Sequence, residues 1–296
     1  MGVIDDMRTG YRQSSMLMKI VWINIGVFVA LRLLAIVGVF SGNPSLINTI
    51  LLWVELPSSP AVLVTRPWTL ISYMFAQYDL LHIVFNMLWL YWFGTMFRMV
   101  GTSRQLLVLY LYGGIAGAVL FLAGYNALPV FSHTDGWLIG SSASVIAIVT
   151  AVAILMPDFK MHLFLIGAVA VKWIAIATIV LVLIGVTGSN AGGEIAHIGG
   201  ILTGAFFATR LKKGQDITMP ASRILDRIKM PDLRARQDRT AHSARSAQQT
   251  EPATGGLSPE ERRELDTILD KIKKSGYSAL TPAERDRLFN VSRKIK

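Results

Sequence analysis

Residues 139–156 read IGSSASVIAIVTAVAILM, an uncharged and strongly apolar stretch of membrane-spanning length. A helix needs about 17–25 predominantly apolar residues to cross a bilayer. Further apolar segments of similar length occupy residues 19–40, 80–97, 105–124, 170–187 and 194–210. This pattern predicts an all-α, polytopic membrane protein built as a bundle of six transmembrane helices.

The composition supports a membrane domain followed by a polar tail. Of the 296 residues, 52% are hydrophobic and 16% are charged, whereas a soluble domain carries about 25% charged residues. The charges concentrate toward the C-terminus, which indicates a change of environment along the chain. We therefore predict a cytoplasmic N-terminal segment (1–18), a membrane domain (19–213), a flexible basic linker (214–257) and a helical hairpin tail (258–296).

Two capping boxes predict the helices of the tail. The segments Ser258-Pro259-Glu260-Glu261 and Thr281-Pro282-Ala283-Glu284 each place a hydroxyl residue three positions before a glutamate, with proline at the first helical position. The predicted hairpin is too small to enclose a large core, and it carries no recognisable catalytic pattern. We interpret it as a docking or regulatory tail.

Lysine and arginine mark one side of the predicted membrane domain. They precede the first span, and they follow the second, fourth and sixth spans. The loops 125–138 and 188–193 contain neither residue. Because cytoplasmic loops are enriched in lysine and arginine, both termini are predicted to lie in the cytoplasm.

The charge and the missing cysteines exclude several classes of function. The chain contains no cysteine, which rules out a disulfide framework, a Cys-ligated metal and a thiol nucleophile. We predict no cofactor and no metal site. The net charge of +10 is assigned to orientation and to contact with membrane lipids. No nucleic-acid-binding motif accompanies it, so no nucleic-acid partner is predicted.

Polar residues recur at the start of the second, fourth and sixth predicted spans. His82 and Asn86 lie four residues apart, on one helix face. Ser142 belongs to Gly140-Ser141-Ser142-Ala143-Ser144, and His197 opens the sixth span. Each group taken alone is compatible with ordinary packing between helices. Because the three spans run in the same direction, all of these residues lie at a similar depth, which predicts one polar cavity open to the outer side.

Small residues predict close contact between the fourth and sixth spans. Gly200 and Gly204 form a small-xxx-small face beside His197, and Ala143 and Ala147 form a matching face on the fourth span. Packing these faces together would bring the outer ends of the two spans into contact. Ser142 would then meet His197.

A histidine beside a serine can take the hydroxyl proton and activate the oxygen for attack. We therefore predict a Ser-His dyad of Ser142 and His197. Glu194 is placed in the loop before the sixth span, so no acidic third member is predicted. The oxyanion of the reaction needs hydrogen-bond donors, which the backbone N–H of Ser142, the ring of His82 and the amide of Asn86 could supply.

These motifs resemble those of the rhomboid intramembrane serine proteases. That family has Gly-x-Ser at the start of its fourth helix, His-x-x-Gly-x-x-x-Gly in the sixth and His-x-x-x-Asn in the second. The resemblance implies that Ser142 is the nucleophile, that His197 is the base, and that His82 and Asn86 belong to the oxyanion site. Ala143 stands where the family often has glycine, so we expect altered packing there.

The resemblance also implies a function and a location. The expected activity is that of a serine endopeptidase that cuts the transmembrane helices of other membrane proteins near the outer face, in a bacterial plasma membrane. The expected partners are transmembrane protein substrates and membrane lipids, while the oligomeric state is left open.

Two other classes of function compete with the protease. A rhomboid-like pseudoprotease would bind membrane clients without cutting them, but such relatives usually lack the serine or the histidine. A small transporter or channel would need polar groups that continue to the inner face, or internal repeats. The sequence shows neither of these, so the protease is favoured.

Overall fold

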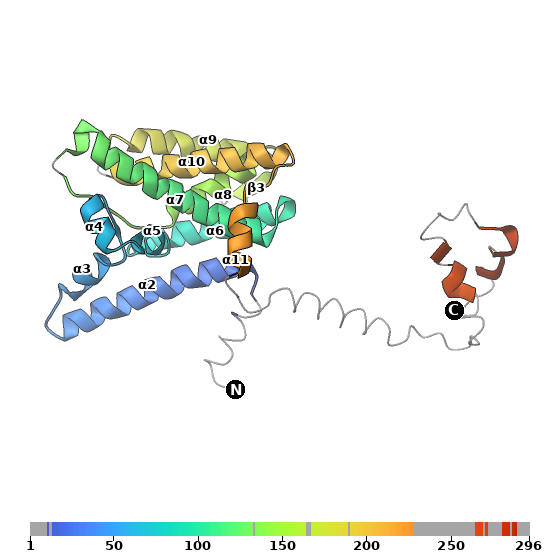
Figure 1. The fold of residues 1–296 in the computed structure, drawn as a ribbon, viewed down its shortest axis with the longest axis horizontal. Coiled ribbons are helices and arrows are strands. Elements are labelled where there is room, and N and C mark those ends of the chain that lie inside the picture. Colours follow the sequence, from blue (N-terminus) through green and yellow to red (C-terminus); the bar gives the residue numbers. More distant parts are fainter. Residues whose placement is uncertain are drawn as a thin grey trace. The chain divides into compact units, whose positions relative to one another are not determined.

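The computed structural model describes residues 11, 14–132, 134–163, 167–188, 190–227, 264–268, 270–271, 280–284 and 286–288. The chain forms two compact units, Met1–Arg227 and Ile228–Lys296. The first unit is a bundle of helices (Figure 1).

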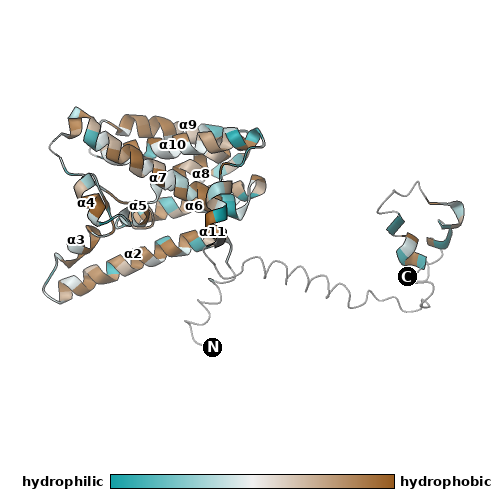
Figure 2. Ribbon diagram, viewed as in Figure 1, coloured by the Kyte–Doolittle hydropathy of each residue, from teal (hydrophilic) through white to brown (hydrophobic). Residues whose placement is uncertain are grey.

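Within the described residues, six helices of 14 residues or more make up the bundle. They are α2 (Met16–Phe40), α6 (Leu80–Val100), α7 (Ser103–Ala127), α8 (Ser142–Leu155), α9 (Val171–Gly185) and α10 (Ala191–Lys212). Each coincides with one of the apolar segments predicted from the sequence. Apolar residues run along most of their surfaces (Figure 2).

Three of these helices have the length and apolar character needed to cross a membrane. They are α2, α6 and α7, whereas α8 and α9 are apolar but shorter. The chain is therefore a mostly helical integral membrane protein.

The short helix α8 lies at the centre of the bundle. It contacts α6, α7, α9 and α10, and 11 of its 14 residues are buried. A helix that is apolar on every side is stable when protein or lipid surrounds it. For α8 the surroundings are mostly protein, which places the start of α8 within reach of several neighbouring helices.

Glycines let α10 lie directly on the backbone of α8. A methyl group added to Gly200 would overlap the carbonyl oxygen of Ala143, and one added to Gly204 would overlap that of Ala147. The predicted contact between these two small-residue faces is therefore confirmed. It fixes the distance between the N-terminal ends of α8 and α10.

Another side of α8 rests on glycines of α7, which also packs against α10. The methyl group of Ala143 lies against Gly117, and that of Ala147 lies against Gly113. Ala143 is buried, with 2% of its surface exposed. The methyl group that replaces the common glycine at this position is thus accommodated by a glycine on the neighbouring helix.

We expect Gly200→Ala to destabilise the membrane domain by about 1–3 kcal/mol, the usual cost of overpacking a close contact. Gly26 is a matched control, because it also lies inside a helix but has no heavy atom within 4 Å of an added methyl. Gly26→Ala should be neutral or stabilising by up to about 1 kcal/mol. Thermal unfolding of both variants in detergent checks this, and equal melting temperatures would contradict the packing described.

The first loop, between α2 and α6, is folded. It contains α3 (Leu46–Leu51), β1 (Leu56–Pro57), α4 (Pro60–Thr65) and α5 (Thr69–Ser72). Trp53 and Trp68 stack with ring centroids 5.8 Å apart. The guanidinium of Arg66 lies 4.4 Å from the centre of the Trp53 ring and donates to the carbonyl of Leu52. This cluster places two exposed tryptophans on the loop, a composition that suits a membrane interface.

A β-hairpin and a helix after α10 were among the elements of the first unit that were not predicted from the sequence. A β-hairpin formed by β3 (Lys160–Leu163) and β4 (Gly167–Ala170) connects α8 to α9. The helix α11 (Met219–Arg227) follows α10 and contacts α7. It lies inside the segment 214–257 that was predicted as a flexible linker. Residues 228–257 lie outside the described residues, and for them the linker remains a prediction.

Asp216 connects the start of α11 to the start of α7. Its carboxylate accepts hydrogen bonds from the backbone and the hydroxyl of Thr218, and from the side-chain amide of Gln105. Burial raises the pKa of this carboxyl, but these hydrogen bonds outweigh burial and lower the pKa below its usual value. Asp216 therefore stays ionised and holds α11 on the end of α7.

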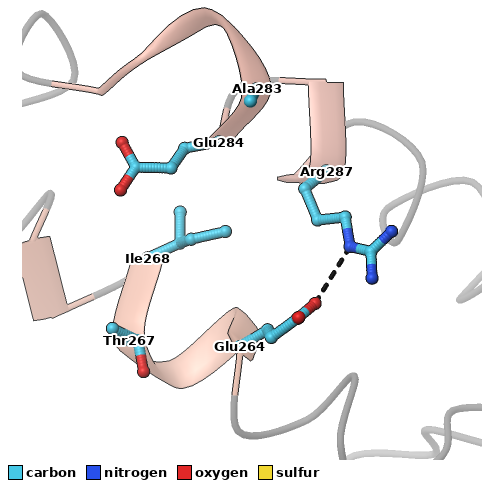
Figure 3. A pocket seen from close by; sticks show the side chains of 6 residues that line it. All are labelled: Glu264, Thr267, Ile268, Ala283, Glu284 and Arg287. Carbon is cyan, nitrogen blue, oxygen red and sulfur yellow. Dashed lines mark hydrogen bonds and ion pairs between the residues drawn. The ribbon is translucent and has the colours of Figure 1, made fainter.

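In the second unit, residues 264–268, 270–271, 282–284 and 286–288 are helical. The backbone N–H and hydroxyl of Thr281 donate to the Glu284 carboxylate, which confirms the second predicted capping box. The first box and residues 258–263 lie outside the described residues. Glu264 pairs with Arg287 across a shallow open pocket that Ile268 also lines (Figure 3). The ion pairs Glu264–Arg287 and Lys271–Glu284 link the helical residues of 264–268 and 270–271 to those of 282–284 and 286–288.

Glu284 gives the tail a stability that depends on pH. Hydrogen bonds from Lys271 and from Thr281 lower the pKa of its carboxyl from 4.5 to about 2. A carboxyl with a lowered folded-state pKa stabilises the fold fully above its unfolded pKa and loses this contribution as it is protonated. We expect the tail to retain this contribution above pH 4.5 and to lose it between pH 4.5 and about 2.

Hydrogen–deuterium exchange of the full chain, corrected for intrinsic exchange rates, checks this prediction. Amides in the segment 280–288 should lose protection across that pH window. Glu284→Gln should already lack this protection at neutral pH, and it should respond much less to acid. Equal pH responses of the two proteins would assign the loss of protection to another group.

Candidate active site

Ser142 and His197 touch near the N-terminal ends of α8 and α10. Ser142 is the first residue of α8, and His197 lies in the second turn of α10. Ser142 Oγ is 2.6 Å from His197 Nε2. Both residues are partly exposed. The close packing of Gly200 on Ala143 brings the two side chains together, as the sequence predicted for this pair.

The other ring nitrogen of His197 contacts a carboxylate. Its Nδ1 lies 2.8 Å from Oε2 of Glu194. The sequence interpretation placed Glu194 in a loop and excluded an acidic third member, and the structure corrects this. Because α10 begins at Ala191 rather than at residue 194, Glu194 lies one turn before His197 on the same helix face.

Tertiary packing explains the early start of α10. Gly192 and Gly193 have low helix propensity, so the sequence pattern favoured a loop here. In the structure Gly192 is buried, and a methyl group added to it would lie 2.7 Å from the ring of Tyr125. The aromatic contact selects glycine at this position and extends the helix to include Glu194.

His82 packs against the backbone that precedes Ser142. It lies in the first turn of α6, where the side chain of Asp79 accepts its backbone N–H. A methyl group added to Gly140 would lie 2.6 Å from Cε1 of His82. Gly140 also has a φ of +126°, a conformation that favours glycine. The predicted oxyanion residue His82 thus lies beside the Gly140–Ser142 segment.

Asn86 is held by a chain of buried hydrogen bonds. Its amide donates to Gln77 Oε1 at 2.8 Å, and the Gln77 amide donates to Asn24 Oδ1 at 3.1 Å. Asn24 in turn donates to the hydroxyl of Tyr110, which donates to the carbonyl of Met74. Asn86 lies one turn along α6 from His82 and keeps one amide hydrogen for another acceptor. Gln77, Asn24 and Tyr110 were not identified from the sequence.

The two neighbouring serines are fully buried, unlike Ser142. Ser141 and Ser144 both have 0% of their surface exposed. A methyl group added to Gly114 of α7 would lie 2.7 Å from Ser144 Oγ, so that hydroxyl points into the α7–α8 contact. Neither serine hydroxyl contacts His197, whose Nε2 bonds Ser142.

Comparison with known proteins bears on this arrangement. The sequence model of the Rhomboid domain matches residues 64–213. The chain belongs to the rhomboid family. Membership of the family, predicted from the three motifs, is thus confirmed. A second model, of a family of unknown function (DUF6576), matches residues 259–294 in the tail.

A curated plant protein is also similar to this chain. RHOMBOID-like protein 12, mitochondrial, from Arabidopsis thaliana is 31% identical over 164 residues. The match covers 51% of this chain and 48% of the relative. The chain thus spans about half the length of the curated relative it matches.

Paired loops position the segment that leads into Ser142 in this rhomboid domain. β1 pairs antiparallel with β2 (Trp137–Leu138). The N–H of Ser58 donates to the carbonyl of Gly136, whose own N–H donates to Ser58 Oγ. The N–H of Gly140 donates to the carbonyl of Tyr73. The first loop therefore holds in place the backbone of residues 136–140, which leads into Ser142.

Proposed function

We propose that this chain is an intramembrane serine endopeptidase in which Ser142 is the nucleophile and His197 the general base. The observation that carries the proposal is the 2.6 Å contact between Ser142 Oγ and His197 Nε2 in a member of the rhomboid family. A serine hydroxyl becomes a competent nucleophile when an adjacent base takes its proton. The neighbouring serines are buried without such a base.

The reaction would proceed in two steps. Ser142 Oγ attacks the carbonyl carbon of the scissile bond while its proton moves to His197 Nε2. His197 then gives this proton to the leaving amine, the C–N bond breaks, and an acyl-serine remains. A water molecule attacks the acyl carbon and gives a proton to His197. Collapse of this second intermediate releases the carboxylic acid and returns the proton to Ser142 Oγ.

The negative oxygen formed in each step needs preorganised donors. The backbone N–H of Ser142 is one of the amides at a helix N-terminus that have no intrahelical partner. The helix dipole of α8 also favours negative charge at this end. We assign the ring of His82 and the remaining amide hydrogen of Asn86 as further donors. The Gly140 contact and the Gln77 hydrogen bond hold these two groups in place.

We further propose that α8, α9 and α10 cross the membrane together with α2, α6 and α7, with both termini cytoplasmic. The short length of α8 suits a helix enclosed by protein rather than by lipid. The lysines and arginines near the ends of the helices follow the pattern of cytoplasmic loops. The substrates would be transmembrane helices of other proteins, cut near the outer face, in a bacterial plasma membrane.

The full chain in liposomes, supplied with a single-span substrate rich in glycine and alanine, tests the proposal. A fluorophosphonate, which bonds covalently to activated serines, is added in parallel. We expect two substrate fragments and one adduct, which mass spectrometry maps to Ser142. Cleavage with an adduct elsewhere would reassign the nucleophile. Intact substrate and no adduct would reject the protease, and co-purification of the uncut substrate would then support a client-binding pseudoprotease.

A further inference from the structure

We propose that Glu194 is a positioning residue for His197, so that the dyad works as a Ser142–His197–Glu194 triad. This inference rests on the proposed protease function. The sequence motifs predicted only a pair of serine and histidine. The contact of the Glu194 carboxylate with His197 was found in the structure. Glu194 touches the base and not the substrate, so its role is to orient the ring and to stabilise its charge.

The partners of the imidazole select the tautomer of the neutral ring. An ionised carboxylate can only accept a hydrogen bond, so Nδ1 of His197 must carry the hydrogen in its 2.8 Å contact with Glu194. In the neutral ring, Nε2 then has a free lone pair that accepts the Ser142 hydroxyl across 2.6 Å. This is the tautomer that a general base needs. Without the carboxylate, the other tautomer would direct an N–H at the serine.

The structure holds the Glu194 carboxylate between two helices. On one side lies His197, three residues later in α10. On the other side lies Gly185, the last residue of α9, where an added methyl would lie 2.8 Å from the Cγ and Cδ atoms of Glu194. The side chains of His197 and Glu194 are 15% and 18% exposed. A glycine at position 185 therefore makes room for the acid beside the base.

Glu194 interacts with the histidine and does not form a surface ion pair with lysine or arginine among the described residues. Across the described ranges, its charged partner is His197, and neither lysine nor arginine pairs with it. When His197 takes the proton of Ser142, the ring becomes positively charged beside this carboxylate. The attraction stabilises the ring in the transition state, while the proton remains on the imidazole.

The expected loss of kcat on removing the Glu194 charge can be estimated from serine proteases that have an orienting carboxylate. Removing the charge of a buried orienting carboxylate lowers kcat by about 10⁴-fold. Solvent access weakens such interactions, and Glu194 is partly exposed. We expect Glu194→Gln to lower kcat roughly 10- to 100-fold, with little change in KM, since glutamine can turn its amide toward Nδ1 and favour the wrong tautomer.

The test compares Glu194→Gln, Glu194→Asp and the control Asp135→Asn in the full chain. Asp135 is an exposed acid on the loop that precedes Ser142. Melting temperature, kcat, KM and the rate of fluorophosphonate labelling at Ser142 are measured for each. We expect Glu194→Gln to slow cleavage and labelling together at an unchanged melting temperature. Glu194→Asp should recover part of the rate, and Asp135→Asn should match the wild type.

Two further variants separate positioning from a general structural role. In a His197→Ala background, Glu194→Gln should cause no additional loss, because the acid acts through the histidine. Gly185→Ala keeps the carboxylate but pushes it from its place, so it should lower kcat in the same direction. Additive losses with His197→Ala would overturn the inference.

The failure of this inference can be told apart from that of the proposed function. An active wild type with equally active Glu194→Gln overturns the positioning role and leaves the protease standing. A wild type that neither cuts nor labels overturns the proposed function, and the triad with it.

Discussion

Replacing Ser142 by alanine is expected to lower cleavage by at least about 10⁴-fold. In the proposed reaction this hydroxyl forms the covalent bond, and within the described part of the chain it is the hydroxyl that contacts His197 Nε2. His197→Ala should cause a loss of similar size. The double variant should be no worse than either single one, because the two groups act as one unit.

The neighbouring serines provide matched controls for this experiment. Ser144→Ala removes a hydroxyl that is buried against α7, and it should retain most of the activity. All variants should elute and melt like the wild type. Cleavage that persists in Ser142→Ala, with the protein purified to homogeneity, would assign the nucleophile to another residue.

Removing either proposed oxyanion donor is expected to lower kcat by about 10²–10³-fold with a small effect on KM. His82→Ala and Asn86→Ala are the variants to measure. The reason is that these donors meet a charge that exists only in the transition state and its neighbouring intermediates. Labelling by a fluorophosphonate should slow as well, since its phosphoryl oxygen occupies the same site.

Gln77 separates the chemical role of Asn86 from its structural role. Gln77→Ala breaks the buried chain of hydrogen bonds but leaves the Asn86 amide in the protein. It should lower the melting temperature while retaining more activity than Asn86→Ala. Equal losses of kcat in the two variants would show that Asn86 contributes through the network alone.

Local patterns in the sequence were sufficient for the helices and for the central contact. Each long apolar segment became a helix, because apolar length is read directly from the residues. The contact of Ser142 with His197 followed from two glycines and two alanines at four-residue spacing. Small residues at that spacing leave few other ways for two helices to approach.

What the sequence left open depended on distant partners. Glu194 was misplaced because Gly192 and Gly193 are typical of a loop in the sequence, whereas in the structure the ring of Tyr125 packs on Gly192. The bonds that hold Asn86 join residues from three separate parts of the chain, and no local spacing predicts them. The hairpin of β3 and β4 has strands of four residues each, too short to give a clear alternating pattern.

The short length of α8 also bears on how deep Ser142 would lie in the membrane. Its 14 residues extend about 21 Å at about 1.5 Å per residue, while the hydrocarbon core is about 30 Å thick. In the proposed orientation, with α8 ending at the inner boundary, Ser142 would lie about 9 Å below the outer boundary, a depth of roughly six helical residues. The proposed protease would then select a peptide bond by its distance from the bilayer edge as well as by the residues around it.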